Sequence, residues 1–157
     1  MTIVQQHIDH LTAMKSSVED VLRDILTEHS GEIIDLVRFG QLAKGLNSYD
    51  KPLQWAYGSG FYAKNTQGWA DKQGLSVPKT KGSPYNFQWT GDTFDSMGFK
   101  LVSKSYDIFT IAGKQSLLEG IYGDIFNLTK EHNDYVNKKI LEPNLVKWIE
   151  ENWWKLL

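Results

Sequence analysis

An unbroken amphipathic stretch at the start of the chain constrains the fold more than any other feature. Between residues 2 and 29, apolar side chains recur at steps of three and four, so at about 100° per residue they share one broad face of a helix. They are Val4, Ile8, Leu11, Met14, Val18, Val21, Leu22, Ile25 and Leu26. Lys15 interrupts that face, and its stem must extend along it to reach solvent. The stretch predicts a long helix that packs either in the core of its own chain or against a neighbouring subunit.

Composition excludes several classes of protein. The 157 residues, of which 41% are apolar, suit a single domain over residues 1–157 with its own core. A formal net charge of −2 lacks the basic footprint of a dedicated nucleic-acid binder. With no cysteine there is no disulfide and no thiolate metal site. No run approaches the roughly 18–20 continuous apolar residues of a membrane helix, so no membrane association is expected.

The middle of the chain is expected to hold a small antiparallel sheet. Residues 85–89 alternate aromatic and amide side chains, which is typical of a half-buried strand. Residues 99–103 and 108–112 read as two more strands, joined by a turn at 104–107. Between the first strand and the second, residues 91–97 suit one or two helical turns.

Two further segments precede the sheet. The run at residues 33–37 is rich in Ile, Leu and Val and is interpreted as a short β-like segment. Residues 65–83 contain repeated Gly, Asn, Ser and Pro, and they predict a long flexible loop.

The C-terminal part is expected to be helical. Residues 114–121 predict a short helix, and Thr129 suits the cap of another that reaches about Leu141. Pro143 is placed to open a final helix that extends to Leu157. The expected fold is therefore α+β: a long N-terminal helix packed on a small antiparallel β-sheet, with a helical C-terminus.

The sequence offers little for catalysis. His7 and His10 are spaced i, i+3 on the first helix, but no third metal ligand accompanies them. His29 and His132 each stand alone and are more typical of surface residues than of catalysts. Asp95 follows Asp92 at i, i+3, and the pair is interpreted as a helix cap and a solvated side chain. We therefore predict no enzyme, no catalytic residues, no cofactor and no metal.

Two groups of residues are predicted to contact partners. Between residues 56 and 90 the charged residues are four lysines and one aspartate, which gives the loop a local positive charge that suits DNA or an acidic neighbour. A solvated surface loop is the alternative for this segment. On the final helix, Trp153 lies on the apolar face and Trp154 on the opposite side, where tryptophan is typical of an interface. The candidate partner-binding residues are Trp154, Trp153, Lys64, Lys72, Lys79 and Lys81.

One pattern resembles a known family. A hydrophobic residue precedes Thr-Gly, a serine follows a few residues later, and a strand–turn–strand comes next, before an aromatic-and-glycine segment. The matching residues are Trp89, Thr90, Gly91, Phe94 and Ser96, the hairpin around Tyr106 and Asp107, and residues 122–128. This part of the chain resembles the tail-completion or head–tail joining (neck) structural proteins of tailed bacteriophages. Residues 35–45 are also similar to a stretch found in phage structural proteins.

The resemblance implies a non-enzymatic virion protein at the head–tail connector or upper tail. Such a protein assembles with copies of itself into a homo-oligomeric ring and contacts adjacent neck or tail proteins. It would be assembled in the cytoplasm of the bacterial host and reside in the virion. Nonspecific contact with DNA through residues 64–81 is a further expectation. The alternatives are an intracellular adaptor or binding module and, with less support, a small hydrolase.

Overall fold

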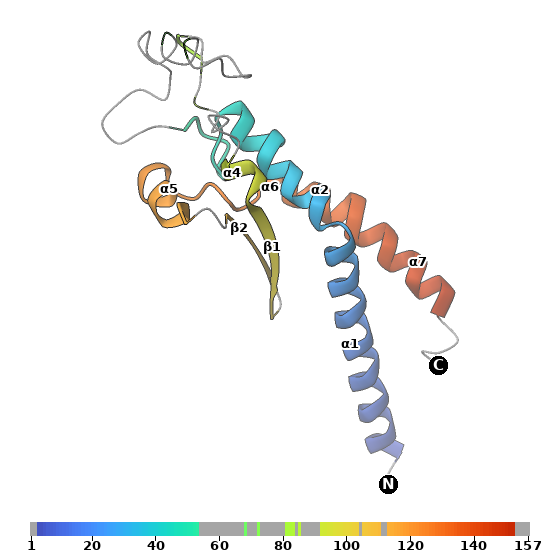
Figure 1. Ribbon diagram of the computed structural model, residues 1–157. Helices are drawn as coiled ribbons and strands as arrows, with labels where there is room; N and C mark the ends of the chain where they lie inside the picture. Colours follow the sequence, from blue (N-terminus) through green and yellow to red (C-terminus); the bar gives the residue numbers. More distant parts are fainter. Residues whose placement is uncertain are drawn as a thin grey trace. The chain divides into compact units, whose positions relative to one another are not determined.

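A computed structural model describes residues 3–53, 68, 72, 81–83, 85, 92–103, 105–110 and 113–152 (Figure 1). The chain forms two compact units. Unit 1 combines the stretch up to Ser30 with the stretch from Asp134 onward, and unit 2 spans Gly31–Asn133. Helices predominate among the described residues, and a small antiparallel sheet lies within unit 2. The predicted α+β class is confirmed, with its long N-terminal helix and helical C-terminus.

Unit 1 is built on the predicted long helix. Helix α1 covers Ile3–Glu28, 26 residues, and is therefore about 39 Å long. The C-terminal helical segments η3 (Val136–Leu141) and α7 (Glu142–Asn152) contact it. Among the described residues of unit 1, the buried apolar side chains are Ile25, Val136 and Ile140. Within unit 1, the chain's own C-terminal helices thus contact α1, and Ile25 near the C-terminal end of α1 is buried.

The C-terminal helices follow one another without a break. Helix α6 (Lys130–Tyr135) leads into the π-helical η3, and α7 begins at the next residue, Glu142. Two separate helices had been predicted, with Pro143 opening the second. Pro143 is instead the second residue of α7, directly after the π-helical segment, where its missing N–H is tolerated. The predicted extension of this helix beyond Asn152 lies outside the described residues.

Unit 2 begins with a helix where a strand was predicted. Helix α2 covers Ser30–Asp35, the π-helical η1 covers Leu36–Gln41, and the 3₁₀ turn η2 covers Leu42–Lys44. The β-like interpretation of residues 33–37 is wrong. Ile33 and Val37 are fully buried at i, i+4, a helical spacing, so packing of this face outweighs the β propensity of the branched side chains. Gly45 ends the segment in the left-handed conformation, with φ at 75°.

The hairpin is present, but its strands start earlier than predicted. The short helix α4 (Asp92–Asp95) leads into β1 (Met97–Val102), which pairs antiparallel with β2 (Ser105–Thr110). Val102 pairs with Ser105, so two residues make the turn instead of the predicted four at 104–107. Ser103 adopts a left-handed φ of 49°, which a tight two-residue turn requires and which the sequence does not signal with glycine or asparagine.

The rest of unit 2 closes the core around this hairpin. The helix predicted at residues 114–121 is α5 (Gln115–Tyr122), and the apolar segment that follows buries Ile125, Phe126 and Leu128. The other buried apolar residues among the described part of this unit are Ile33, Val37, Leu42, Leu53, Phe94, Met97 and Ile108. Of the strand predicted at 85–89 the structure describes Tyr85 alone, and most of the loop predicted at 65–83 lies outside the described residues.

Candidate functional site

The predicted partner-binding residues fall largely outside the structure's described part. Trp153, Trp154, Lys64 and Lys79 are not among the described residues. Lys72 and Lys81 are described, and both are exposed. The candidate site that the structure supports lies elsewhere, on the long helix.

Helix α1 carries a heptad seam along its whole length. Positions separated by alternating steps of four and three residues lie on one narrow stripe, which is the repeat of a coiled-coil interface. On α1 these positions are Val4, Ile8, Leu11, Lys15, Val18, Leu22, Ile25 and His29. With one exception, Lys15, the seam is apolar up to the histidine that follows the helix.

The two halves of this seam differ in burial. In the C-terminal half, Ile25 is 7% exposed, and Val18 and Leu22 are half-buried. At the end of the seam, His29 Nε2 lies 3.5 Å from Asn144 Nδ2 of α7. The chain's own C-terminal helices therefore cover this half.

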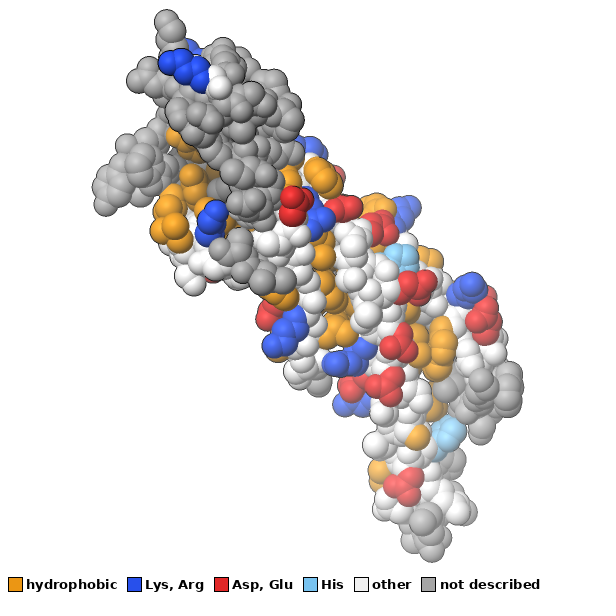
Figure 2. All heavy atoms as spheres, in the orientation of Figure 1, with side chains coloured by type: hydrophobic (Ala, Val, Ile, Leu, Met, Phe, Trp, Pro, Cys, Tyr) orange, Lys and Arg blue, Asp and Glu red, His pale blue; other side chains and the backbone are white. Residues whose placement is uncertain are grey.

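The N-terminal half of the seam is exposed. Val4 is 67% exposed, Ile8 50% and Leu11 63%. Figure 2 shows hydrophobic side-chain atoms at the surface among polar and charged ones along this helix. We call the four residues Val4, Ile8, Leu11 and Lys15 the α1 stripe. A row of large exposed apolar side chains on one helix face is typical of interaction surfaces.

Lys15 gives the α1 stripe one charge. Its side chain is 71% exposed, and Nζ lies 4.0 Å from Glu19 Oε1 one turn along the helix. A lysine at a core position of a coiled coil reduces stability but restricts register and oligomeric state. The stripe thus combines apolar contact area with a feature that selects how a partner helix aligns.

A second group of residues fixes the structure of unit 2. The fully buried Gln41 side chain donates from Nε2 to the Asn127 carbonyl oxygen at 3.0 Å. Its Oε1 accepts from the Thr129 backbone N–H at 3.1 Å and lies 2.9 Å from His132 Nδ1. Because this oxygen can only accept, the His132 hydrogen resides on Nδ1. One side chain therefore connects η1 to α6 and to the segment before it, 86 to 91 residues away.

Two neighbouring features support this connection. Thr129 Oγ1 accepts from the His132 backbone N–H at 3.2 Å, which confirms Thr129 as the predicted cap of α6. The His132 ring also lies against Gly40, where a Cβ atom would be 2.5 Å from His132 Cε1. Residue 40 must be glycine for the ring to sit here. The interpretation of His132 as an isolated surface residue is wrong: it is half-buried and bonded to Gln41.

Burial sets the charge state of His132. Desolvation lowers the pKa of its imidazole below the ordinary value of 6.5, and this effect outweighs the opposing fields of Glu131 and Asp50. A histidine whose pKa is lower in the folded state than in the unfolded state stabilises the folded protein at pH values above the unfolded-state pKa. That contribution is lost as the pH falls below about 6.5, because the unfolded state then binds the proton more tightly.

We therefore expect wild-type protein to lose stability between about pH 7.5 and about pH 5, and to lose more of it than the variant His132→Gln, which cannot take up this proton. Urea unfolding followed by circular dichroism at the two pH values measures the difference. Groups that titrate equally in both proteins cancel in this comparison. Equal losses in the two proteins would show that the His132 environment does not favour the neutral ring.

Two further features are absent from the described residues. In that part of the chain, no three His, Asp or Glu side chains gather as a metal site would require. The helices described there include none long and apolar enough to cross a membrane. Comparison of the chain with protein-family models, curated proteins and solved structures gives no match.

Proposed function

We propose that this protein is a non-enzymatic assembly subunit that associates with further copies of itself through the α1 stripe. We place this role in a ring at the head–tail junction or upper tail of a tailed bacteriophage. The observation that carries the proposal is the half-covered seam of α1. Its C-terminal half packs within unit 1, while three large apolar residues of its N-terminal half remain exposed.

The energetics favour a partner for this half. Covering a large aliphatic side chain contributes about 1.5–3 kcal/mol, so three such residues supply a substantial driving force for association. Part of this is offset by the freedom lost when two molecules associate. In a closed ring each subunit makes this contact with two neighbours, so the modest contributions add up.

Lys15 favours one kind of association over another. In a parallel two-fold pair of α1 helices, the two Lys15 ammonium groups would lie at the same level and repel each other. A heterologous contact, in which different surfaces of neighbouring subunits meet, places Lys15 beside other residues of the neighbour. Heterologous contacts that close generate rings. The stripe is therefore better suited to a ring than to a parallel dimer.

The phage setting is supported by the sequence resemblance. The hairpin that follows Ser96 starts at Met97, directly after α4, in the order that the resemblance implies. Buried Ile125, Phe126 and Leu128 occupy the late apolar segment of the same pattern. The sequence resemblance is our basis for choosing a neck protein over an adaptor.

Electron microscopy tests this function. Negatively stained purified protein is expected to show rings of uniform diameter, and antibody labelling of virions of the encoding phage or prophage is expected at the neck or upper tail. Irregular aggregates or monomers in place of rings would contradict the assembly role. Labelling that is absent from virions that contain all other structural proteins would contradict the phage setting.

A further inference from the structure

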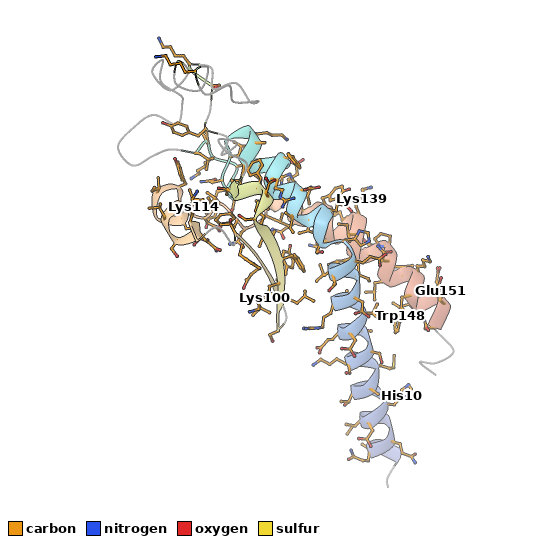
Figure 3. All side chains as sticks on the ribbon, viewed as in Figure 1. His10, Lys100, Lys114, Lys139, Trp148 and Glu151 are labelled. Atoms are coloured by element: carbon orange, nitrogen blue, oxygen red, sulfur yellow. The ribbon has the colours of Figure 1, made fainter. Side chains whose placement is uncertain are left out.

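A cavity of about 520 Å³ lies in unit 2. Residues of both hairpin strands, of α5 and of the apolar segment that follows α5 line it. Figure 3 shows the side chains of this region and labels Lys100, which lines the cavity from β1. The volume lies within the range of about 300–1,000 Å³ that is usual for small-molecule sites. The groups on its walls determine which class of molecule fits it.

The strand wall of the cavity carries two opposite charges and an aromatic ring. Lys100 and Asp107 are cross-strand partners, so their side chains lie on the same face of the hairpin. Phe109, two residues after Asp107, belongs to that face as well. Its ring lies over its own partner Gly98, where a Cβ atom would be 2.7 Å from Phe109 Cζ. This wall therefore places a carboxylate next to an aromatic surface.

The helical wall holds a second carboxylate in place. Glu119 is half-buried and lies one turn after Gln115 on α5. Gln115 Oε1 accepts from the Thr110 backbone N–H of β2 at 3.4 Å, and Gln115 Nε2 donates to Glu119 Oε1 at 3.0 Å. Because one amide side chain joins the strand to the carboxylate, the position of Glu119 relative to β2 is fixed. This hydrogen bond uses Oε1, so Glu119 Oε2 is left for a ligand.

A third part of the lining is apolar and well anchored. Phe126 is 3% exposed and lines the cavity beside Asn127. Asn127 is held from two directions, because its Nδ2 donates to Asp124 Oδ2 at 2.9 Å and its carbonyl oxygen accepts from Gln41. The cavity therefore combines a fixed apolar surface with a few polar groups, which is the usual composition of a small-molecule site.

The charge on the described lining is net negative. Two carboxylates, Asp107 and Glu119, stand against the one ammonium group of Lys100. Within the described part of the chain, Lys100 forms an ion pair with neither of them. The lining therefore attracts a cation and repels an anion. A bare metal ion fits poorly, because the described residues bring no three His, Asp or Glu side chains together.

We propose that this cavity binds a small organic cation, a primary amine whose ammonium group reaches Asp107 and Glu119 and whose apolar body covers Phe109 and Phe126. A primary ammonium group has three N–H donors, so the two carboxylates can share it. The apolar body gains free energy by leaving water, and an aromatic ring face attracts the cation in addition. This site is independent of the assembly role of the α1 stripe.

An NMR titration of the full chain tests the proposal. The probe is 2-phenylethylamine, and its control is 2-phenylethanol, which has the same ring and chain but a hydroxyl in place of the ammonium group. The amine is expected to cause saturable amide shifts at residues 107–109, 115–119 and 126–127. The alcohol is expected to bind at least about tenfold more weakly. Absence of saturable shifts with the amine, equal binding of both molecules, or shifts confined to other residues would overturn the proposal.

Ligand charge and salt separate ion pairing from simple apolar binding. The anion 3-phenylpropionate is expected to cause no saturable shift at the residues that respond to the amine, because the carboxylates repel it. Raising the salt concentration from about 0.05 M to about 0.5 M is expected to weaken the amine severalfold, since salt screens the attraction. Binding of the anion at the same residues, or an amine affinity that does not respond to salt, would contradict the role of the carboxylates.

Protein variants with opposite expected effects test the lining. Glu119→Gln keeps an oxygen for Gln115 but removes the carboxylate, and it is expected to weaken amine binding by about tenfold. Lys100→Gln removes the competing cation from an exposed position and is expected to strengthen binding by about threefold. Asp95→Asn, at an exposed residue that does not line the cavity, is the matched control and is expected to bind like wild type. Unchanged affinity in Glu119→Gln, weaker binding in Lys100→Gln, or a loss in Asp95→Asn equal to that in Glu119→Gln would overturn the proposal.

Discussion

Replacement of Gln41 by alanine is expected to lower the free energy of unfolding by about 3–5 kcal/mol. The reason is the number of polar groups that depend on this one side chain. The Asn127 carbonyl, the Thr129 N–H and His132 Nδ1 would all lose a partner, and a cavity would form at a residue that is 0% exposed. Urea unfolding followed by circular dichroism measures the loss.

Two comparison variants identify the cause of the stability loss in Gln41→Ala. Gln41→Met fills most of the same space without hydrogen-bonding groups, so it is expected to recover part of the packing contribution but not the polar one. Gln6→Ala removes an exposed glutamine on α1 and is expected to change stability by less than about 0.5 kcal/mol. A loss below about 1 kcal/mol in Gln41→Ala would contradict the role of Gln41 as the central connection of unit 2.

The double variant Ile8→Glu/Leu11→Glu is expected to abolish self-association without loss of thermal stability. Both side chains are at least half exposed in the structure, so glutamate replaces them without entering the core. At an interface, however, two unpaired carboxylates would be buried against apolar side chains at a cost of several kcal/mol. Sedimentation measures the association, and circular dichroism on heating measures the stability.

The chain provides a matched control for this variant. Gln6 and Ala13 are exposed on α1, two positions before Ile8 and two after Leu11, and are not part of the heptad seam. Gln6→Glu/Ala13→Glu therefore adds the same charge to the same helix away from the stripe. It is expected to associate like wild type, and a loss in this control as well would indicate general charge repulsion.

Local sequence signals identified the elements that depend on local interactions. The apolar period of three and four residues predicts α1, and the hydroxyl of Thr129 predicts the start of α6 because a cap acts within one helical turn. The same reasoning failed at residues 33–37. There the β-branched side chains favour a strand, but Ile33 and Val37 are fully buried on one helical face, and burial is a tertiary effect that overrides local propensity.

The structural connection at Gln41 could not be predicted for a related reason. Gln41 and His132 are 91 residues apart, and neither belongs to a motif that would connect them. The hairpin turn was misplaced because Ser103 adopts a left-handed backbone without the glycine or asparagine that usually signals it. For the α1 stripe, the sequence gives the apolar face, but the structure is needed to show which half of it remains exposed.

Sedimentation equilibrium of wild type and of Ile8→Glu/Leu11→Glu, at matched concentrations, tests the assembly role of the α1 stripe most directly. We predict a discrete oligomer for wild type and a monomer for the double variant, with the same thermal unfolding curve for both. A monomeric wild-type protein, or a double variant that keeps the wild-type mass, would contradict the proposal that copies of this chain associate through the α1 stripe.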